Sequence, residues 1–489
     1  MTTPHPTATQ PQSARAPSGL RRLIGLVSGA AAALAMLAFP APEGMPAEAW
    51  RVAAITILMA TWWVWEAIPI AATALVPIAL LPLLGVAPIA DAAAPFANPL
   101  VFLFLGGFCI AIAMERWNLH RRIALAILAV VGTRPDRVVA GFLAATAGLS
   151  MWVSNTATAT MMLPIALTVA GLMAGAREGG FAIPLLLAIA FGANIGGMGT
   201  LIGTPPNALF AGYMQETYGI EIGFAQWMLV GVPFAIVLLV VTWLVLTRVA
   251  FRLDDRPVDG ADAELRRQID DLGPIARGER LVLLVFVLTA LGWIFRPLIE
   301  RATGLVLSDA AIAVLAAIAL FAIPVDVRRR TFLLDWSDTA KLPWGVLVLV
   351  GGGLSLGAAI ESSGLSAWVA GNLTLLSEVP AWTAVAAIGL VVMLISHVTS
   401  NTATAATFLP LAGSFAALAG VAPVLVCAPV ALAAGCAFMM PVATPPNAIV
   451  FASGQLTVPD MIKAGALVNA VAVGLLAVFV LTVVPAVLG

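Results

Sequence analysis

The sequence predicts an all-α protein that crosses a membrane many times. Of its 489 residues, 61% are hydrophobic and only 10% are charged, whereas soluble proteins carry about 25% charged residues. The mean hydropathy is +1.03, and the apolar residues form long runs rich in Ala, Leu and Val. Membrane β-barrels alternate polar and apolar residues instead. With spans of ~20 residues, the apolar length allows about a dozen crossings, which excludes a soluble multidomain enzyme.

The chain opens with residues 1–19, which are rich in Pro, Thr, Ser and Ala. This composition predicts a disordered tail on the cytoplasmic side, and residues 20–48 are expected to contain the first transmembrane helix. The apolar segments, in chain order, are 23–40, 50–67, 70–90, 98–117, 138–174, 181–211, 224–250, 280–298, 305–324, 343–360, 380–419, 424–453 and 464–488.

Two of these segments, 138–174 and 380–419, are too long for one simple crossing. Each carries a polar cluster in its middle. We expect both to be re-entrant hairpins, which enter the membrane and return on the same side. Two shorter and less apolar stretches, 119–132 and 365–378, are expected to lie along the membrane surface as interfacial helices.

The distribution of Lys and Arg orients the chain, because these residues collect in cytoplasmic loops. The hairpin 138–174 has basic residues at both ends, so we expect it to open to the cytoplasm. No Lys or Arg occurs from Leu342 to Ile462, so the hairpin 380–419 is expected to open to the outside. The other segments then give about eleven spans, with a cytoplasmic N-terminus and an external C-terminus. The basic loops are 116–137, 248–280 and 326–341.

Two motifs occur twice in the chain. Ser154–Ala159 recurs unchanged as Ser400–Ala405, and Thr204–Ala208 recurs as Thr444–Ala448. Because the two hairpins open to opposite sides, the repeats are expected to have inverted topology, which is typical of secondary transporters with a site near the membrane midplane. The predicted domains are repeat 1 at 49–250, with hairpin 138–174 and broken helix 181–211; a cytoplasmic linker at 251–279; and repeat 2 at 280–489, with hairpin 380–419 and broken helix 424–453.

The hairpin tips carry the first chemical signal. At such a tip one helix ends with free carbonyl groups and the next begins with free N–H groups. Carbonyl, Ser and Asn oxygens suit a hard cation such as Na⁺, and the positive N–H ends suit a carboxylate. The tips at Asn155 and Asn401 can therefore hold a cation on one side and an anion on the other. The alternative is that these small polar residues only join neighbouring helices.

The Thr-Pro-Pro-Asn motif predicts a broken helix. Proline lacks an N–H and breaks a helix interior, yet it is favoured in a first turn. Thr204 and Thr444 are therefore expected to cap the second half of each broken helix, and Gly203 and Ala443 to present free carbonyls just before it. A simple kink is the alternative.

Two ionisable residues lie in apolar surroundings. Glu66 is interpreted as a structural residue near a membrane face or a helix end, with a coupling carboxylate as the alternative. His397 is either a hydrogen-bonded packing residue or an imidazolium that modulates coupling at a second cation site.

The sequence places no Lys or Arg near either tip. A divalent anion must then be neutralised by co-bound cations and helix N-termini, which predicts obligatory cation coupling or exchange of one anion for another. The chain has no P-loop and no zinc-binding HExxH motif, so neither ATP-driven pumping nor intramembrane hydrolysis has support. We expect that the protein is not an enzyme.

On these residues the chain resembles the divalent anion:sodium symporter family, the INDY-type dicarboxylate and citrate carriers. The resemblance runs from about Trp63 to the C-terminus, and the paired motifs are highly specific together. It is carried by Trp65–Pro69, Phe104–Phe108, Ser150–Thr156, Ile195–Thr200 and Pro441–Asn447.

The resemblance implies a homodimer in the inner (plasma) membrane, surrounded by lipid, in which each protomer has a scaffold and a transport domain that moves as an elevator. It implies Na⁺ as coupling ion and a small dicarboxylate as substrate, without an organic cofactor or nucleic acid. The implied first sodium site is Ser150, Ser154, Asn155 and Gly203, and the second is Ser396, Thr399, Asn401 and Ala443. The implied substrate ligands are Asn155, Thr156, Asn401 and Thr402, with Thr204, Thr444 and Pro445 nearby.

Two residues depart from the family pattern. His397 stands where many sodium-coupled members carry an acidic residue, and Thr204 stands where many carry Ser. The resulting hypothesis is import of C4-dicarboxylates such as succinate, malate or fumarate together with Na⁺. The alternatives are a sodium-independent dicarboxylate exchanger, a carrier of citrate or sulfate, an anion-binding membrane receptor without flux, and an intramembrane enzyme, for which no nucleophile–base pair is visible.

Overall fold

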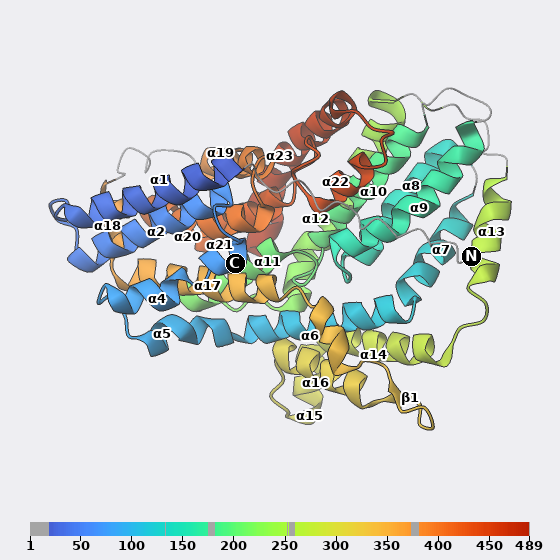
Figure 1. Ribbon diagram of the computed structural model, residues 1–489, viewed down its shortest axis with the longest axis horizontal. Helices are drawn as coiled ribbons and strands as arrows, with labels where there is room; N and C mark the ends of the chain where they lie inside the picture. The colour runs from blue at the N-terminus through green and yellow to red at the C-terminus, as the bar shows by residue number, and fades with distance from the viewer. Residues whose placement is uncertain are drawn as a thin grey trace, which may run out of the picture.

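The computed structural model describes residues 19–132, 134–174, 181–251, 253, 260–372 and 381–488. These residues form an elongated bundle of helices (Figure 1). All of the predicted tail except Gly19 lies outside the described residues, as does the end of the predicted interfacial stretch 365–378. The described residues are mostly helical, in agreement with the predicted all-α class.

The helices of the first half are α1 (Gly19–Ala38), α2 (Ala47–Trp65), α3 (Ile70–Thr73), α4 (Val76–Leu83), α5 (Ile89–Ala93), η1 (Ala94–Ala97), α6 (Pro99–Arg116), α7 (Leu119–Val131), α8 (Pro135–Ser150), α9 (Asn155–Ala174), α10 (Ala182–Gly197), α11 (Pro205–Tyr218), α12 (Phe224–Leu244) and the π-helical η2 (Val245–Val249). The later elements are α13 (Ala261–Asp271), α14 (Arg277–Ile294), α15 (Arg296–Thr303), α16 (Asp309–Ala322), β1 (Pro324–Asp326), β2 (Thr331–Phe332), η3 (Trp336–Lys341), α17 (Trp344–Ser362), α18 (Leu365–Asn372), α19 (Ala381–Ser396), α20 (Asn401–Ala419), α21 (Pro423–Ala434), α22 (Pro445–Phe451) and α23 (Val458–Leu488).

Both long apolar segments are divided at their polar clusters. The first splits into α8 and α9, with a break between Ser150 and Asn155, and the second into α19 and α20, with a break between Ser396 and Asn401. The members of each pair pack against one another. The segments 181–211 and 424–453 are also divided, and their second halves, α11 and α22, begin at the first proline of Thr-Pro-Pro-Asn, where proline is tolerated.

The two halves of the chain pack against each other in a reciprocal pattern. Helix α22 of the second half packs against α9 and α10 of the first, and α11 of the first half packs against α20 and α21 of the second. Likewise, α6 packs against α16, and α17 packs against α3 and α4. Corresponding helices of the two halves thus make corresponding contacts, and the inverted topology of the repeats stays a prediction.

Paired glycines permit two of these close approaches. A Cβ atom on Gly106 of α6 would overlap the carbonyl oxygen of Ala313, and one on Gly352 of α17 would overlap the carbonyl oxygen of Ala74. Real side chains do not approach backbone oxygens so closely. Small residues let helix backbones meet in membrane proteins, and Gly106 and Gly352 occupy equivalent positions in the two sequence repeats.

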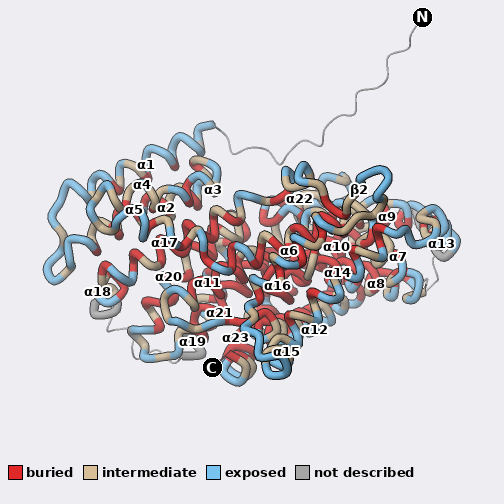
Figure 2. Tube along the Cα trace, turned by 90° about the horizontal axis from the view of Figure 1, so that it is seen from below, coloured by how far each residue is buried: buried red, intermediate tan, exposed pale blue. Residues whose placement is uncertain are grey.

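The centre of the molecule is formed by α10 and α21. Figure 2 shows buried residues concentrated along α10, α11 and α21 and exposed residues at the periphery. Every residue of α10 from Pro184 to Gly197 is buried, as is every residue of α21 from Val426 to Ala434. A helix that is apolar on all sides is expected to lie in such a central position.

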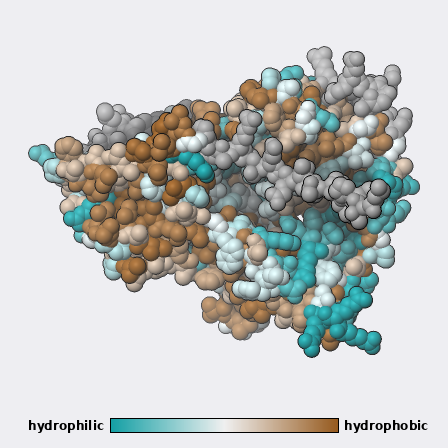
Figure 3. Space-filling model, in the orientation of Figure 1, coloured by the Kyte–Doolittle hydropathy of each residue, from teal (hydrophilic) through white to brown (hydrophobic). Residues whose placement is uncertain are grey.

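Several helices are long and apolar enough to cross a membrane. Among the described residues there are five such helices, or six if α14 and α15, which are bent by 79° at their junction, form one span. Shorter apolar helices, including α10, α16 and α21, accompany them. In Figure 3 hydrophobic residues cover much of the face over α1, α4 and α5, and a hydrophilic cluster lies where Figure 1 places the β1–β2 hairpin. The number of spans stays a prediction.

Some local features differ from the sequence-based expectation. The segment 70–90 does not form one helix, because α4 ends at Leu83 and is followed by Gly85, whose φ of +65° cannot continue a helix. A short antiparallel hairpin of β1 and β2 interrupts the helical pattern. The predicted linker 251–279 contains an amphipathic helix, α13.

Candidate functional site

The two helix breaks lie side by side in the centre of the bundle. The ring of Phe191 on α10 lies 5.0 Å from the ring of Phe438, which follows α21. The Nδ2 group of Asn194 on α10 donates a hydrogen bond to Thr444 Oγ1, which caps α22, at 3.0 Å. The interrupted helix of one repeat is therefore in direct polar contact with that of the other.

Each hairpin tip lies against the helix break of its own repeat. At the first tip, Thr200 Oγ1 donates to the carbonyl oxygen of Met151 at 2.5 Å. At the second, Asn469 Nδ2 on α23 lies 3.1 Å from both His397 Nε2 and the carbonyl oxygen of Cys436. Residues that are far apart in the sequence thus form one polar region inside an apolar bundle.

The first tip brings together three of the four residues predicted for the first sodium site. Ser150 Oγ lies 2.5 Å from Asn155 Oδ1 and 2.8 Å from the carbonyl oxygen of Ala193. A Cβ atom on Gly197 would lie 2.8 Å from Asn155 Oδ1 and 3.1 Å from the carbonyl oxygen of Gly203. The Asn155 side chain and the Gly203 carbonyl therefore face the same small space. Such oxygens are the ligands that a hard cation prefers.

The fourth residue of that predicted site is placed differently. Ser154 is exposed, and its Oγ accepts a hydrogen bond from the backbone N–H of Ala157 at 3.2 Å. This is the contact of a helix-capping hydroxyl, so Ser154 closes the first turn of α9. Its neighbour Thr156, predicted as a substrate ligand, is also exposed.

The second tip leaves two oxygen atoms without a hydrogen-bond partner. Ser396 Oγ and Asn401 Oδ1 are buried and unpaired among the described residues. They are the equivalents of Ser150 and Asn155, whose side chains contact each other in the first repeat. A buried polar atom without a partner is costly, and a cation bound by both atoms would remove that cost.

The other residues predicted at the second tip differ in their contacts and exposure. Thr399 Oγ1 is already engaged, because it lies 2.7 Å from Thr404 Oγ1 and 2.9 Å from the carbonyl oxygen of Ile395. Its remaining acceptor lone pair and its backbone carbonyl are the groups left to serve a cation. Ala443 is buried, whereas Thr402 is partly exposed and Pro445 is exposed.

His397 is held by a hydrogen bond at each ring nitrogen. Nδ1 lies 2.7 Å from the carbonyl oxygen of Met393, which can only accept, so Nδ1 carries a proton. Nε2 lies 3.1 Å from Asn469 Nδ2, which donates. This pairing corresponds to a neutral imidazole and to the packing interpretation of His397; its role in coupling stays a prediction.

Glu66 lies at the C-terminal end of α2. It has a left-handed backbone conformation with φ of +46°, and its N–H bonds to the carbonyl oxygens of Trp62 and Trp63. A residue of this kind closes a helix. The position agrees with the interpretation of Glu66 as a structural residue at a helix end.

The asparagine of each Thr-Pro-Pro-Asn motif closes the break in its helix. The sequence motif contains this residue but does not indicate its role. Asn207 Nδ2 donates to the carbonyl oxygens of Gly197 and Thr200 at 3.1 and 2.8 Å. Asn447 Nδ2 donates to the carbonyl oxygens of Ala437 and Met440 at 3.0 and 2.9 Å. The asparagine of each Thr-Pro-Pro-Asn motif thus pairs carbonyls that lie at or just after the end of the preceding half-helix.

Asn194 and Asn469 were not predicted as site residues. Both are buried polar side chains in long apolar runs, with exposed fractions of 3% and 6%. Polar residues inside membrane segments are costly and mark functional contacts, so their position in the sequence was a usable signal. Their partners lie in other helices, which the sequence alone does not show.

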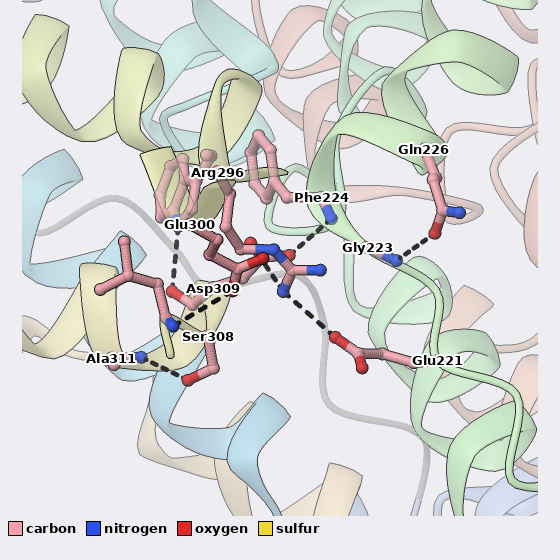
Figure 4. Close-up of polar contacts among 11 residues, drawn as sticks. Glu221, Gly223, Phe224, Gln226, Arg296, Glu300, Ser308, Asp309 and Ala311 are labelled. Carbon is pink, nitrogen blue, oxygen red and sulfur yellow. Dashed lines mark hydrogen bonds and ion pairs between the residues drawn. The ribbon is translucent and has the colours of Figure 1, made fainter. Parts of the chain in front are cut away.

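Away from the tips, a polar cluster joins the loop before α12 to α15 and α16 (Figure 4). Arg296 Nη1 lies 3.1 Å from Glu221 Oε1 and 3.3 Å from Asp309 Oδ1. Asp309 Oδ2 accepts a hydrogen bond of 2.7 Å from the N–H of Phe224, the first residue of α12. The carboxylate therefore stabilises the positive end of that helix.

Gly353–Gly357 matches the Gly-x-Ser-x-Gly pattern of serine hydrolases. In those enzymes the serine sits on a sharp turn between a strand and a helix. Here the segment lies inside α17, and Ser355 is buried with its hydroxyl donating to the carbonyl oxygen of Ala92 at 2.8 Å. Ser355 is a helix-packing residue.

Comparison with known proteins gives a consistent family. Residues 20–487 match the family model described as the sodium:sulfate symporter transmembrane region. The sodium-dependent dicarboxylate transporter SdcS of Staphylococcus aureus strain bovine RF122 / ET3-1 is 42% identical over 484 residues, which cover 97% of this chain and 93% of that protein. The SdcS protein of strain USA300 is similar to the same extent.

Two solved structures share the fold at low sequence identity. MtrF of Neisseria gonorrhoeae aligns with a TM-score of 0.56 and 13% identity over 95% of this chain and 94% of its own. The YdaH transporter of Alcanivorax borkumensis aligns with a TM-score of 0.57 and 15% identity over 87% of this chain and 97% of its own. At this identity the similarity concerns the architecture.

Proposed function

The chain belongs to the divalent anion:sodium symporter family, which the sodium:sulfate symporter model defines, and from this premise we propose that it imports C4-dicarboxylates together with Na⁺. The candidate substrates are succinate, malate and fumarate. A dicarboxylate is favoured over sulfate because the relatives that cover 97% of this chain are named sodium-dependent dicarboxylate transporters. The chain is then a transporter and not an enzyme.

The observation that carries the proposal is the pair of unpartnered oxygens at the second tip, Ser396 Oγ and Asn401 Oδ1. Buried neutral oxygens attract a cation that has lost part of its water. The proposed second sodium site adds the backbone carbonyls of Thr399 and Ala443. The proposed first site consists of Ser150, Asn155 and the Gly203 carbonyl, with Ser154 contributing through its backbone.

The substrate is proposed to lie between the tips. Its carboxylates would meet the first turns of α9, α20, α11 and α22, which begin at Asn155, Asn401, Pro205 and Pro445. Helix N-termini offer free N–H groups and positive potential. Between residues 138 and 247 the only basic residue is Arg177, and none occurs between 342 and 462. The bound Na⁺ ions would therefore supply the charge that balances the dianion, which couples the two.

We propose an elevator for the movement. The two hairpins and the two broken helices would form the moving domain, and α6, α14, α16 and α17 would belong to the scaffold. The reciprocal packing of α11 with α21 and of α22 with α10 supports a rigid moving unit built from two inverted repeats. The homodimer, the plasma-membrane location, and the cytoplasmic N-terminus and external C-terminus are part of the same proposal.

A thermal-unfolding screen of the purified protein tests the assignment of ligands. Ligand binding stabilises the folded state by about 2.7 kcal/mol when the ligand is at 100 times its dissociation constant. Succinate should therefore raise the unfolding temperature, and only when Na⁺ is present, because its binding is proposed to require the bound cations. Stabilisation by citrate or sulfate instead would change the substrate. Stabilisation by succinate in choline chloride would favour sodium-independent exchange, and binding without flux in liposomes would favour a receptor.

A further inference from the structure

Asn194 joins the first repeat to the capping residues of the second. Its Nδ2 group donates to Thr444 Oγ1 at 3.0 Å and to Asn447 Oδ1 at 3.2 Å. All three residues are buried, with exposed fractions of 3%, 4% and 0%. Asn447 in turn uses its own Nδ2 group to bind two carbonyls of the helix break. Asn194 therefore completes the hydrogen bonding of the Asn447 amide.

These contacts determine what the Thr444 hydroxyl can still do. A hydroxyl has two acceptor lone pairs and one proton to donate. Thr444 Oγ1 accepts from Asn194 Nδ2 at 3.0 Å and from the Asn447 backbone N–H at 3.3 Å. Both acceptor positions are occupied, so the hydroxyl has only its proton left to offer. A group in this state binds a carboxylate oxygen and is unsuited to a cation.

The first repeat lacks this arrangement. At the offset of 240 that relates the two Thr-Pro-Pro-Asn motifs, the counterpart of Asn194 is Ala434, on α21, which packs against α11. Thr204 has nearly the same backbone conformation as Thr444 but makes no capping hydrogen bond with its side chain. Asn207 Oδ1 is buried without a partner among the described residues. Ala434 offers no amide donor, which accounts for the unpartnered Asn207 Oδ1.

We propose that Asn194 is a positioning residue that makes the Thr444 hydroxyl an obligate donor to one carboxylate of the substrate. The proposal rests on the proposed function, since it concerns the same site. It makes the two ends of the site unequal: the end at α22 has a fixed hydroxyl donor, and the end at α11 does not. Asn194 acts through Thr444 and does not itself touch the substrate.

A double-mutant cycle in proteoliposomes tests this relation. The variants are Asn194→Ala, Thr444→Val and the double variant, with the half-saturating concentrations of succinate and of Na⁺ measured for each. Asn194→Ala should raise the succinate value by about tenfold or more, as for one lost hydrogen bond to a charged group, and leave the Na⁺ value within about twofold. The double variant should be no worse than Thr444→Val alone.

Matched controls separate positioning from a general loss of structure. Thr204→Val lies at the equivalent position of the other repeat, so its effect should multiply with that of Asn194→Ala. Asn194→Ser replaces the alanine variant if that variant unfolds, because serine keeps a polar group in the buried position. Serine is too short to reach Thr444, so it also removes the hydrogen bond. Thr444→Ser keeps the hydroxyl. It should therefore keep the wild-type half-saturating concentration of succinate, but only when Asn194 is present.

The outcomes distinguish the two levels of the argument. If the wild type transports succinate but Asn194→Ala and Asn194→Ser leave its half-saturating concentration unchanged, the positioning role is refuted. Multiplying effects of Asn194→Ala and Thr444→Val would also refute it. If the wild type itself neither binds nor transports a dicarboxylate, the proposed function fails, and the positioning role that rests on it fails with it.

Discussion

Asn207 and Asn447 close the two broken helices through equivalent hydrogen bonds. Each amide donates to the carbonyl oxygens ten and seven residues before it, which belong to Gly197 and Thr200 in one repeat and to Ala437 and Met440 in the other. The free carbonyls of a helix end inside a membrane need such partners. An asparagine three residues after each threonine is therefore needed to pair the backbone carbonyls of the helix break.

Asn207→Ala and Asn447→Ala should both destabilise the protein, because each leaves buried carbonyls unpaired at a cost of about 1–3 kcal/mol per group. Asn447→Ala should have the larger effect, since Asn447 also accepts from Asn194. Thermal unfolding in detergent measures both changes. Thr160→Ala, which removes only a hydroxyl bonded within α9, is the control, and unfolding temperatures equal to its own would show that the amides do not hold the breaks.

Asn155→Ala and Asn401→Ala should each abolish succinate uptake, because each tip amide is proposed to serve both a sodium ion and the substrate. The measurement is uptake by proteoliposomes with matched protein content. Thr407→Ala is the control on the second hairpin, since its hydroxyl donates to the Ala403 carbonyl of its own helix. Full activity of either tip variant would refute the site assignment.

Ser396→Ala should raise the half-saturating Na⁺ concentration by about tenfold, as for the loss of one ligand to a charged partner. Ser414→Ala removes an equally buried hydroxyl from the same hairpin, but that hydroxyl is bonded to the Pro410 carbonyl. It should leave the Na⁺ dependence unchanged. Identical Na⁺ dependence of the Ser396 variant and the wild type would remove Ser396 from the second sodium site.

Arg296→Gln should shift the balance between the two end states of the proposed elevator. Arg296 on α15 pairs with Glu221, in the loop that follows the moving helix α11, and a contact present in only one state favours that state. Because Glu221 is largely exposed, the shift should be within about fivefold.

The rate of maleimide labelling of a single cysteine introduced at Val442, which is 76% exposed, reports this balance. The native cysteines are buried and contribute little background. Arg267→Gln breaks an ion pair within α13 and serves as the control. If Arg296→Gln and Glu221→Gln label at the same rate as that control, the ion pair does not restrain the movement.

The sequence located the helix breaks well because their signals are local. Asn155, Asn401, Pro205 and Pro445 each begin a helix, and capping residues and first-turn prolines act over only a few positions. Gly203 lies beside Asn155. The family resemblance implies this neighbourhood, whereas the separation of the two residues along the sequence does not.

The sequence alone does not show which segments far apart along the chain contact one another. Asn194 and Thr444 are separated by 250 positions, and only the packing of α22 on α10 brings them together. The family resemblance implies Ser154 as a sodium ligand, which stays a prediction; its hydroxyl caps α9, because a serine at a helix start has a backbone donor within reach. Burial of individual oxygens, as at Ser396, depends on the same tertiary packing.

The most direct test of the central claim is uptake of radiolabelled succinate by proteoliposomes with an inward Na⁺ gradient, compared with choline chloride on both sides. Sodium-coupled import predicts accumulation above equilibrium with the gradient and none in choline. It also predicts that unlabelled malate and fumarate compete with succinate. Accumulation that ignores Na⁺ and requires dicarboxylate inside the vesicles, or no dicarboxylate uptake at all, would contradict it.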